Sequence, residues 1–327
     1  KDNKTLKIEA LRTLNNLTDL KIEQIVRWQN ERWGDAGLIQ SSGNISEAVY
    51  RFVIRGDKSQ RESIQNILNS YKQLYHYKDY RLIDNQGKVF LSGSKENSVL
   101  GSYAQSILKD IIHKRTIFLS DIHLSPINNK PHMDLWIPIL YPVNEYNASV
   151  VGLIIFEIDP DQFLYPYLEK WTNPTKTSES FLVRQEGKEV VFISPLRNSK
   201  AKPLEMRLPL SRSELVAVRA IKGEKEIPYG KDYRGKWVLS AAKPVPGSNW
   251  YLVAKVDRDE VLAPAKEKGL WILGTVIILV GFCLFTILLI WKQQQVHLEN
   301  LALQNEMEKK RYQGRYELLA QNAYDTI

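Results

Sequence analysis

The sequence predicts an α+β fold: a long N-terminal helix beside two related antiparallel-sheet lobes, then a transmembrane helix and a further helix. Three observations predict it. Apolar residues near the start recur at helical spacing, two hairpin patterns occur twice in the same order, and one long stretch carries no charge. With 327 residues, of which 43% are hydrophobic and 25% charged, the chain has room for two or three folded domains.

The first 75 residues are predicted to hold the long helix and the further helices of the first lobe (1–75). Apolar residues in this segment are spaced by threes and fours, and polar residues occupy the remaining positions. The stripe comprises Ile8, Leu11, Leu14, Ile22, Ile25 and Trp28. Such a helix can pack along the side of two lobes.

A strand, a glycine-containing turn and a second strand are predicted twice. The first copy is "YRLIDNQGKVFLSG" at 80–93 and the second is "FLVRQEGKEVVFIS" at 181–194. A second hairpin follows each copy, as "IPILYPVNEYNASVVGLIIFEID" from Ile137 and as "VLSAAKPVPGSNWYLVAKVD" from Val238. Two matches in the same order predict two copies of one α+β unit, over 76–165 and 166–266.

Residues 270–291, "LWILGTVIILVGFCLFTILLIW", contain no charge and no proline. At about 1.5 Å per residue the segment spans roughly 33 Å, enough to cross the hydrocarbon core of a bilayer. Tryptophans stand at its two ends, where indole rings favour the interface. The excess of Lys and Arg beyond the segment predicts that 292–327 is cytoplasmic and 1–268 extracytoplasmic.

Residues 292–314 are rich in Gln, Glu, Leu and Lys and should continue as a helix, whose thin apolar stripe is compatible with a parallel homodimer. The net charge of +8 is scattered among acidic residues and no nucleic-acid motif is present, so no nucleic-acid partner is expected. The single cysteine, Cys283, excludes an intrachain disulfide and a cysteine-based zinc site. Because the chain begins at Lys1 without methionine, we expect it to belong to a longer protein.

Several phrases carry a family resemblance. They are "SDIH" with "HMDLWIPI", "FEIDPDQFLYPYLEKW" and "DYRGKWVLSAAKPVPGSNWYLVAKVDRDEVLAP". On these phrases the first 268 residues resemble the double-Cache family, the tandem PAS-like sensor domains of membrane receptors, in the subgroup found on PAS-containing histidine kinases. Residues 315–327, "RYELLAQNAYDTI", are similar to the opening of a cytoplasmic PAS domain.

The resemblance implies a homodimeric receptor that binds a small molecule in its membrane-distal lobe and signals through the membrane helix. The expected parent protein is a sensor histidine kinase, with a diguanylate cyclase or a chemoreceptor as the alternative. Amino-acid-binding members carry an Arg-x-Trp-Tyr stretch and an Asp in the closing strand. This chain lacks that stretch and offers Glu157 in the strand, so amino-acid recognition does not follow from the resemblance.

The segment around "SDIHLSPINNKPHMDLW" holds the main candidate site. Residues two apart on a strand share a face, so a hairpin across "LSPINNKP" would bring five side chains together. They are Asp121, His123, His132, Asp134 and Trp136, a set that suits a polar or cationic small ligand. Further candidates for the same pocket are Tyr80, Tyr103, Arg115 and Glu157, each of which could instead be an ordinary packing or paired residue.

Other interpretations of this segment remain open. Its aspartates and histidines could bond the turn backbone and only brace the hairpin. A metal needs three or four ligands at about 2.0–2.2 Å; two His and two Asp could supply them, but no diagnostic spacing is present. We therefore predict no metal and no cofactor, and, without a nucleophile or an obvious acid/base pair, no catalytic residue. A membrane-tethered metal-binding protein or enzyme is the less favoured alternative.

Overall fold

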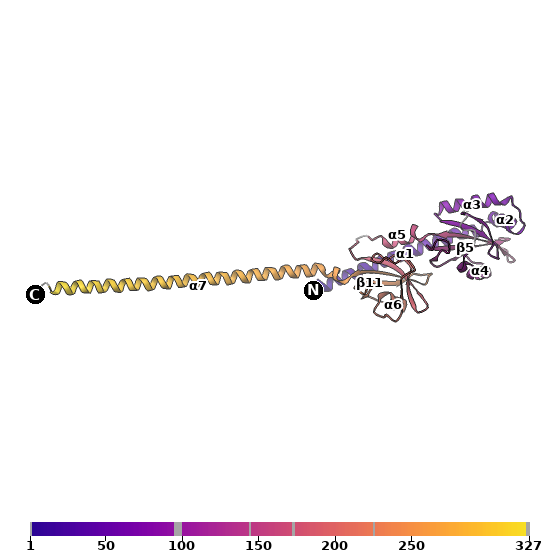
Figure 1. Ribbon diagram of the computed structural model, residues 1–327. Coiled ribbons are helices and arrows are strands. Elements are labelled where there is room, and N and C mark those ends of the chain that lie inside the picture. The colour runs from indigo at the N-terminus through magenta and orange to yellow at the C-terminus, as the bar shows by residue number, and fades with distance from the viewer. Residues whose placement is uncertain (1, 95–99, 144, 172–173, 225, 325–327) are drawn as a thin grey trace. The chain divides into compact units, whose positions relative to one another are not determined.

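The computed structural model describes residues 2–94, 100–143, 145–171, 174–224 and 226–324 (Figure 1). They form two compact units, one ending at Leu262 and the other beginning at Ala263. The predicted fold class is confirmed: a long N-terminal helix, two antiparallel sheets and a C-terminal apolar helix follow one another along the chain.

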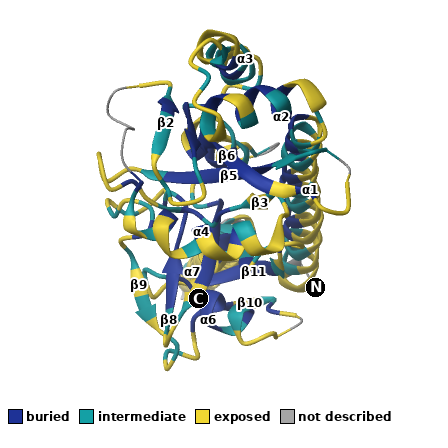
Figure 2. Cartoon of the chain, turned by 90° about the vertical axis from the view of Figure 1, so that its right-hand side faces the viewer, coloured by how far each residue is buried: buried dark blue, intermediate teal, exposed yellow. Residues whose placement is uncertain are grey.

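The first sheet, which we call the distal sheet, has the strand order β2-β1-β6-β5-β3, with β4 paired to β5. Its strands are β1 (Asp79–Ile83), β2 (Val89–Ser92), β3 (Phe118–Leu119), β4 (His123–Leu124), β5 (Pro131–Tyr141) and β6 (Ser149–Ile158). The long strands β5 and β6 are buried over most of their length (Figure 2). Both faces of this sheet are therefore covered.

Strand alternation divides the distal sheet into two faces. On one face Met133, Leu135 and Ile137 pack with helical residues. These helices are α1 (Asp2–Gln40), α2 (Gly43–Val49), the π-helical turn η1 (Tyr50–Ile54) and α3 (Gln60–Leu74). On the other face Trp136 and Ile155 pack against α4 (Ser102–Lys114). We call this second side the α4 face.

The second sheet, which we call the proximal sheet, has the order β10-β11-β12-β7-β8-β9. Its strands are β7 (Glu179–Glu186), β8 (Glu189–Phe192), β9 (Arg207–Pro209), β10 (Tyr229–Lys231), β11 (Trp237–Pro244) and β12 (Trp250–Asp257). The helix α6 (Val216–Ile221) packs on one of its faces. The run β8-β7-β12-β11 repeats the run β2-β1-β6-β5, as expected for two copies of one unit.

The hairpin turns of the two copies also match. Gly87 and Gly187 lie in equivalent turns with φ of 85° and 57°, a region in which glycine meets no steric penalty. Gly87 and Gly187 thus supply the same positive-φ conformation at equivalent turns.

Helix α1 lies beside both sheets (Figure 2). Its buried residues Leu14, Ile25 and Trp28 come from the predicted stripe, whereas Ile8 is half exposed. Between the lobes the chain passes through η3 (Pro160–Gln162) and α5 (Leu164–Glu169). The buried Lys21 of α1 donates hydrogen bonds to the carbonyls of Leu168 and Lys170, at 3.0 and 2.8 Å, and so fastens α1 to α5.

The C-terminal helix α7 (Arg258–Tyr324) contains the predicted membrane segment and the predicted cytoplasmic helix without a break. By length and composition it is the one described helix that could cross a membrane. It begins before the apolar segment, with Asp259 and Glu260 in the first turn, where negative charge is favourable. Of the stretch expected to open a PAS domain (315–327), the part up to Tyr324 is helical and 325–327 lie outside the described residues.

Candidate functional site

Asp134, on β5, is the centre of a buried polar group on the α4 face. Its side chain is 1% exposed, and its Oδ1 accepts a hydrogen bond of 3.0 Å from Arg81. Arg81 and Asp134 come from β1 and β5, which flank β6, so the guanidinium reaches across the middle strand. A buried carboxylate requires such a partner, because desolvation of an unpaired charge costs several kcal/mol.

Two histidines complete the group. His123 and His132 are direct partners across the β4–β5 pair, and their ring centroids are 4.1 Å apart. Their Nε2 atoms lie 3.5 and 3.8 Å from Oδ2 of Asp134. Tyr103 of α4 packs against the His123 ring at a centroid distance of 4.2 Å. Of the five side chains expected to converge, His123, His132 and Asp134 lie together here, and Tyr103, a further candidate, contacts His123.

The electrostatics of the group keep Asp134 ionised. Burial raises its pKa, but hydrogen bonding to His123 and His132 and the charge of Arg81 outweigh burial, so the pKa lies well below its ordinary value. Burial and the negative charges of Asp121 and Asp134 raise the pKa of the Tyr103 hydroxyl, which therefore remains protonated and able to donate. The group thus combines an ionised carboxylate, the Arg81 guanidinium and a protonated tyrosine hydroxyl.

A cavity of about 200 Å³ adjoins this group. Glu157 lines it and is the register partner of Asp134, so the two carboxylates are neighbours on one face. The other lining residues are Lys72, Lys78, Asp79, Ser94, Ser125, Ile127 and Asn128. Lys78 approaches Glu157 to 2.6 Å at the rim. The cavity is therefore polar and suited to a small charged molecule.

Three predicted site residues lie elsewhere. Tyr80 points to the opposite face of the sheet, into the core formed with α1 and α3. Trp136 is on the α4 face but wholly buried beneath α4, away from the residues that line the cavity. Arg115 is exposed at the C-cap of α4, where it adopts a left-handed conformation. Strand β1 is buried on both faces, so its sequence pattern does not say which face meets the pocket.

Asp121 also differs from the expectation, because it does not share the orientation of His123. Its carboxylate lies 2.6 Å from the Arg184 guanidinium and accepts a 2.6 Å hydrogen bond from the indole of Trp250, both in the proximal sheet. Only His123 and Leu124 of "SDIHL" are in a strand, so strict alternation does not extend back to Asp121. Asp121 therefore joins the two lobes.

Sequence reasoning missed Arg81, Lys78 and Asp79. Arg81 stands between the predicted Tyr80 and the apolar Leu82 and Ile83, and a charged residue there must find a partner if it is buried. That rule could have identified Arg81 from the sequence. Lys78 and Asp79 precede the hairpin pattern and carry no comparable signal.

The equivalent position in the proximal sheet is occupied by the protein itself. Asp79 pairs with Glu157 in the distal sheet as Glu179 pairs with Lys255 in the proximal sheet. The Lys255 ammonium is fully buried, 2.9 Å from Glu179 and 3.2 Å from Asp232. The copy of the site in the second lobe is therefore filled by an internal cation.

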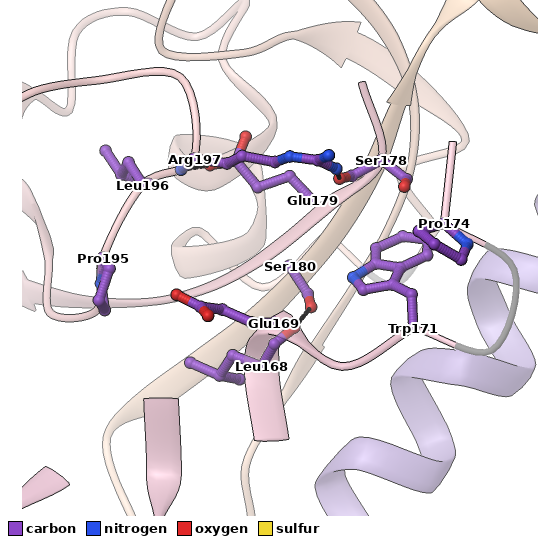
Figure 3. A pocket seen from close by; sticks show the side chains of 10 residues that line it. All are labelled: Leu168, Glu169, Trp171, Pro174, Ser178, Glu179, Ser180, Pro195, Leu196 and Arg197. Atoms are coloured by element: carbon purple, nitrogen blue, oxygen red, sulfur yellow. Dashed lines mark hydrogen bonds between the residues drawn. The ribbon is translucent and has the colours of Figure 1, made fainter. Parts of the chain in front are cut away.

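A second cavity, of about 350 Å³, lies beside α5 and β7 in the proximal lobe (Figure 3). Its lining is apolar at Leu168, Trp171 and Leu196. Glu179 and Ser180 are already engaged, the first by Lys255 and the second by the carbonyl of Leu168. We therefore regard the polar cavity of the distal lobe as the better ligand site.

Comparison with known proteins shows which family shares this architecture. Residues 3–265 match the model of the Cache domain. The chain belongs to the Cache domain family. Cache domains are extracytoplasmic sensors of membrane proteins, and the helix α7 is long and apolar enough to supply the membrane anchor. Membership of this family agrees with the resemblance noted in the sequence.

Solved structures share the fold of this Cache domain at low sequence identity. The sensory domain of the Campylobacter jejuni chemoreceptor Tlp3 (CcmL) with isoleucine bound has a TM-score of 0.56 and 14% identity, over 80% of this chain and 97% of that chain. The ligand-binding domain of Mlp24 with asparagine gives 0.54 and 14%, over 80% and 99%. The sensor domain of the V. cholerae histidine kinase DctB gives 0.51 and 12%, over 76% and 97%. No curated protein sequence matches the chain.

Proposed function

We propose that this Cache domain is the extracytoplasmic small-molecule sensor and transmembrane signalling region of a sensor histidine kinase. It would act as a homodimer in the inner membrane, with 1–268 outside and 292–327 in the cytoplasm. The polar cavity of the distal lobe, which Asp79 and Glu157 line, is the observation that carries this proposal. A ligand shifts a receptor between two arrangements by binding one of them more tightly.

The proposed ligand is a small polar molecule with an amino or other cationic group. Carboxylates of Glu157 and Asp79 line the cavity, and Asp134 lies beside them. The internal ammonium of Lys255 occupies the equivalent place in the proximal lobe, which supports a cation as the natural occupant of such a site. Lys78 would move from the buried Glu157 when the ligand arrives, since the Lys78 side chain is 30% exposed.

The proposed cytoplasmic output domain is a histidine kinase, with a chemoreceptor tail or a diguanylate cyclase as the alternative. The DctB sensor domain, from a histidine kinase, and Tlp3, from a chemoreceptor, share the fold with this chain. The phrases that resemble kinase-linked double-Cache domains favour the kinase. The sequence that follows Ile327 in the parent protein decides the matter: a His-containing dimerisation helix with an ATP-binding domain supports the kinase, and a chemoreceptor tail or diguanylate cyclase domain refutes it.

Ligand binding is tested by thermal unfolding of the full chain in detergent against a panel of amino acids, amines and small carboxylates. A ligand present at 100 times its Kd adds about 2.7 kcal/mol to the free energy of unfolding, which raises Tm measurably. The shift should disappear in Glu157→Gln and persist in Glu169→Gln, a matched exposed carboxylate beside the proximal cavity. Loss in Glu169→Gln with retention in Glu157→Gln would refute the distal site.

A further inference from the structure

Three potential metal ligands converge on the α4 face, apart from the residues that line the polar cavity. His123, His132 and Asp134 each offer one ligand atom, and these atoms all lie within 4.8 Å of one another. The two histidines face each other across a strand pair, and Asp134 is on the same face of β5 as His132. The backbone therefore holds all three in place without depending on a flexible loop tip.

The distances within this cluster are too long for strong hydrogen bonds. The Nε2 atoms lie 3.5 and 3.8 Å from Oδ2 of Asp134, whereas charge-assisted N–H···O bonds are about 2.7–2.9 Å long. A tetrahedral zinc ion with bonds of about 2.0–2.1 Å separates its ligand atoms by about 3.3 Å. The two nitrogen–oxygen distances exceed that separation by a few tenths of an ångström, and all three ligand atoms lie within 4.8 Å of one another, so the side chains must close further to bind such an ion.

The hydrogen bonding of the His123 ring also favours a metal site. Nδ1 of His123 lies 2.9 Å from the backbone carbonyl of Asp121, and a carbonyl can only accept, so Nδ1 carries the proton. A metal-bound histidine commonly donates its other N–H to such an acceptor, which orients the ring.

His132 supplies an independent observation. The residue is 3% exposed, and its Nδ1 has no hydrogen-bond partner among the described residues. A buried polar atom without a partner costs about 1–3 kcal/mol, so such an atom in a native protein calls for an explanation. A metal bound through Nδ1 would satisfy this atom, whereas a metal bound through Nε2, the atom nearer Asp134, would leave it unpaired.

The remaining contacts leave room for an ion. Arg81 occupies Oδ1 of Asp134, so Oδ2 is the oxygen available to a metal. Two imidazoles and one carboxylate suit a borderline divalent ion such as Zn²⁺, whereas Mg²⁺ and Ca²⁺ require more oxygen ligands. Three protein ligands leave the fourth position open to water or an incoming molecule.

We propose that His123, His132 and Asp134 bind a divalent transition-metal ion, with zinc as the ion that fits best. This site goes beyond the small-molecule site proposed above and does not depend on it. It replaces the expectation, drawn from sequence spacing alone, that the segment holds no metal.

The test uses the tag-free full chain in detergent, stripped with EDTA and then titrated with ZnCl₂. One zinc per chain is expected, and Co²⁺ in its place should give the intense visible absorption of a tetrahedral site. His123→Gln and His132→Gln should each weaken zinc binding by at least about tenfold. His113→Gln in α4 and His297→Gln in α7, both exposed histidines that are not part of the cluster, are the matched controls and should not change the affinity.

Absence of stoichiometric zinc, an octahedral cobalt spectrum, or unchanged affinity in both site variants would each overturn the proposal. The cobalt spectrum of the unmodified chain keeps the test decisive even if a variant fails to fold. The thermal-shift test of Glu157→Gln is performed in EDTA, so the metal site and the small-molecule site can fail separately.

Discussion

Glu157 in β6 and Lys255 in β12 occupy equivalent positions in the two sheets and carry opposite charges. Lys255 is enclosed by Glu179 and Asp232, and its ammonium also lies 5.7 Å from the centre of the Tyr233 ring. Glu157 instead borders a cavity. One copy of the repeated unit thus holds a structural ion cluster, and the other borders a cavity at the equivalent position.

Lys255→Met should destabilise the protein by about 3–5 kcal/mol, because it leaves buried carboxylates without their cation. Lys243→Met is the matched control. Lys243 pairs with Asp19 at the surface, and the loss of such a pair costs no more than about 1 kcal/mol. Urea unfolding followed by tryptophan fluorescence measures both, and equal effects would contradict the assignment of Lys255 as a buried structural cation.

The same cluster predicts acid sensitivity. Burial raises the pKa of Asp232, but Arg234 and Lys255 lower it more, so the net pKa is depressed. A depressed carboxyl pKa contributes stability that is present above the unfolded value of about 3.9 and is lost as pH falls towards the folded value. The difference in unfolding free energy between wild type and Asp232→Asn should therefore shrink between about pH 6 and pH 2. A difference that stays constant over this range would be inconsistent with an ionised Asp232 in the folded protein.

Removing Arg81 should lower the free energy of unfolding, because Asp134 would stay buried without its cation. Arg81→Met leaves the ionised carboxylate without its guanidinium and should cost about 3–5 kcal/mol, measured by urea unfolding in EDTA. Arg51→Met breaks a comparable but exposed pair with Asp57 and should cost no more than about 1 kcal/mol. If Arg81→Met is as mild as Arg51→Met, Asp134 is held by other groups.

The proposed orientation can be read from labelling in whole cells. In a Cys283→Ser background, Ser211→Cys in the proximal lobe should react with a membrane-impermeant maleimide in intact spheroplasts. Gln304→Cys in α7 should react only after the membrane is permeabilised. Both positions are exposed in the structure, so differences in reactivity report the side of the membrane. The reverse pattern would invert the topology.

The sequence was informative about the architecture because its signals are local. Matching hairpins with glycines at equivalent turns specify two related sheets, and these glycines take the expected positive φ. The uncharged stretch of α7 and the apolar stripe of α1 likewise depend on neighbours within a few residues. Such patterns can be recognised before any tertiary contact is known.

The site was harder to predict because it depends on which way buried strands face. Strand β1 is buried on both sides, so neither Tyr80 nor Arg81 reveals the pocket face by polarity alone. Asp121 turns to the other lobe because the strand begins only at His123, a boundary that two-residue spacing does not show. His123, His132 and Asp134 were expected to converge only if a hairpin forms across the turn, and the structure pairs His123 with His132 in that way.

Hydrogen exchange of the full chain, with and without the strongest stabilising compound from the panel, tests the central claim most directly. Binding on the α4 face of the distal lobe predicts slower exchange in β1 and in the β4–β5 hairpin, including Ser125 to Lys130, with little change in β7 and β12. Protection confined to the proximal lobe, around Leu168 and Leu196, would contradict the account.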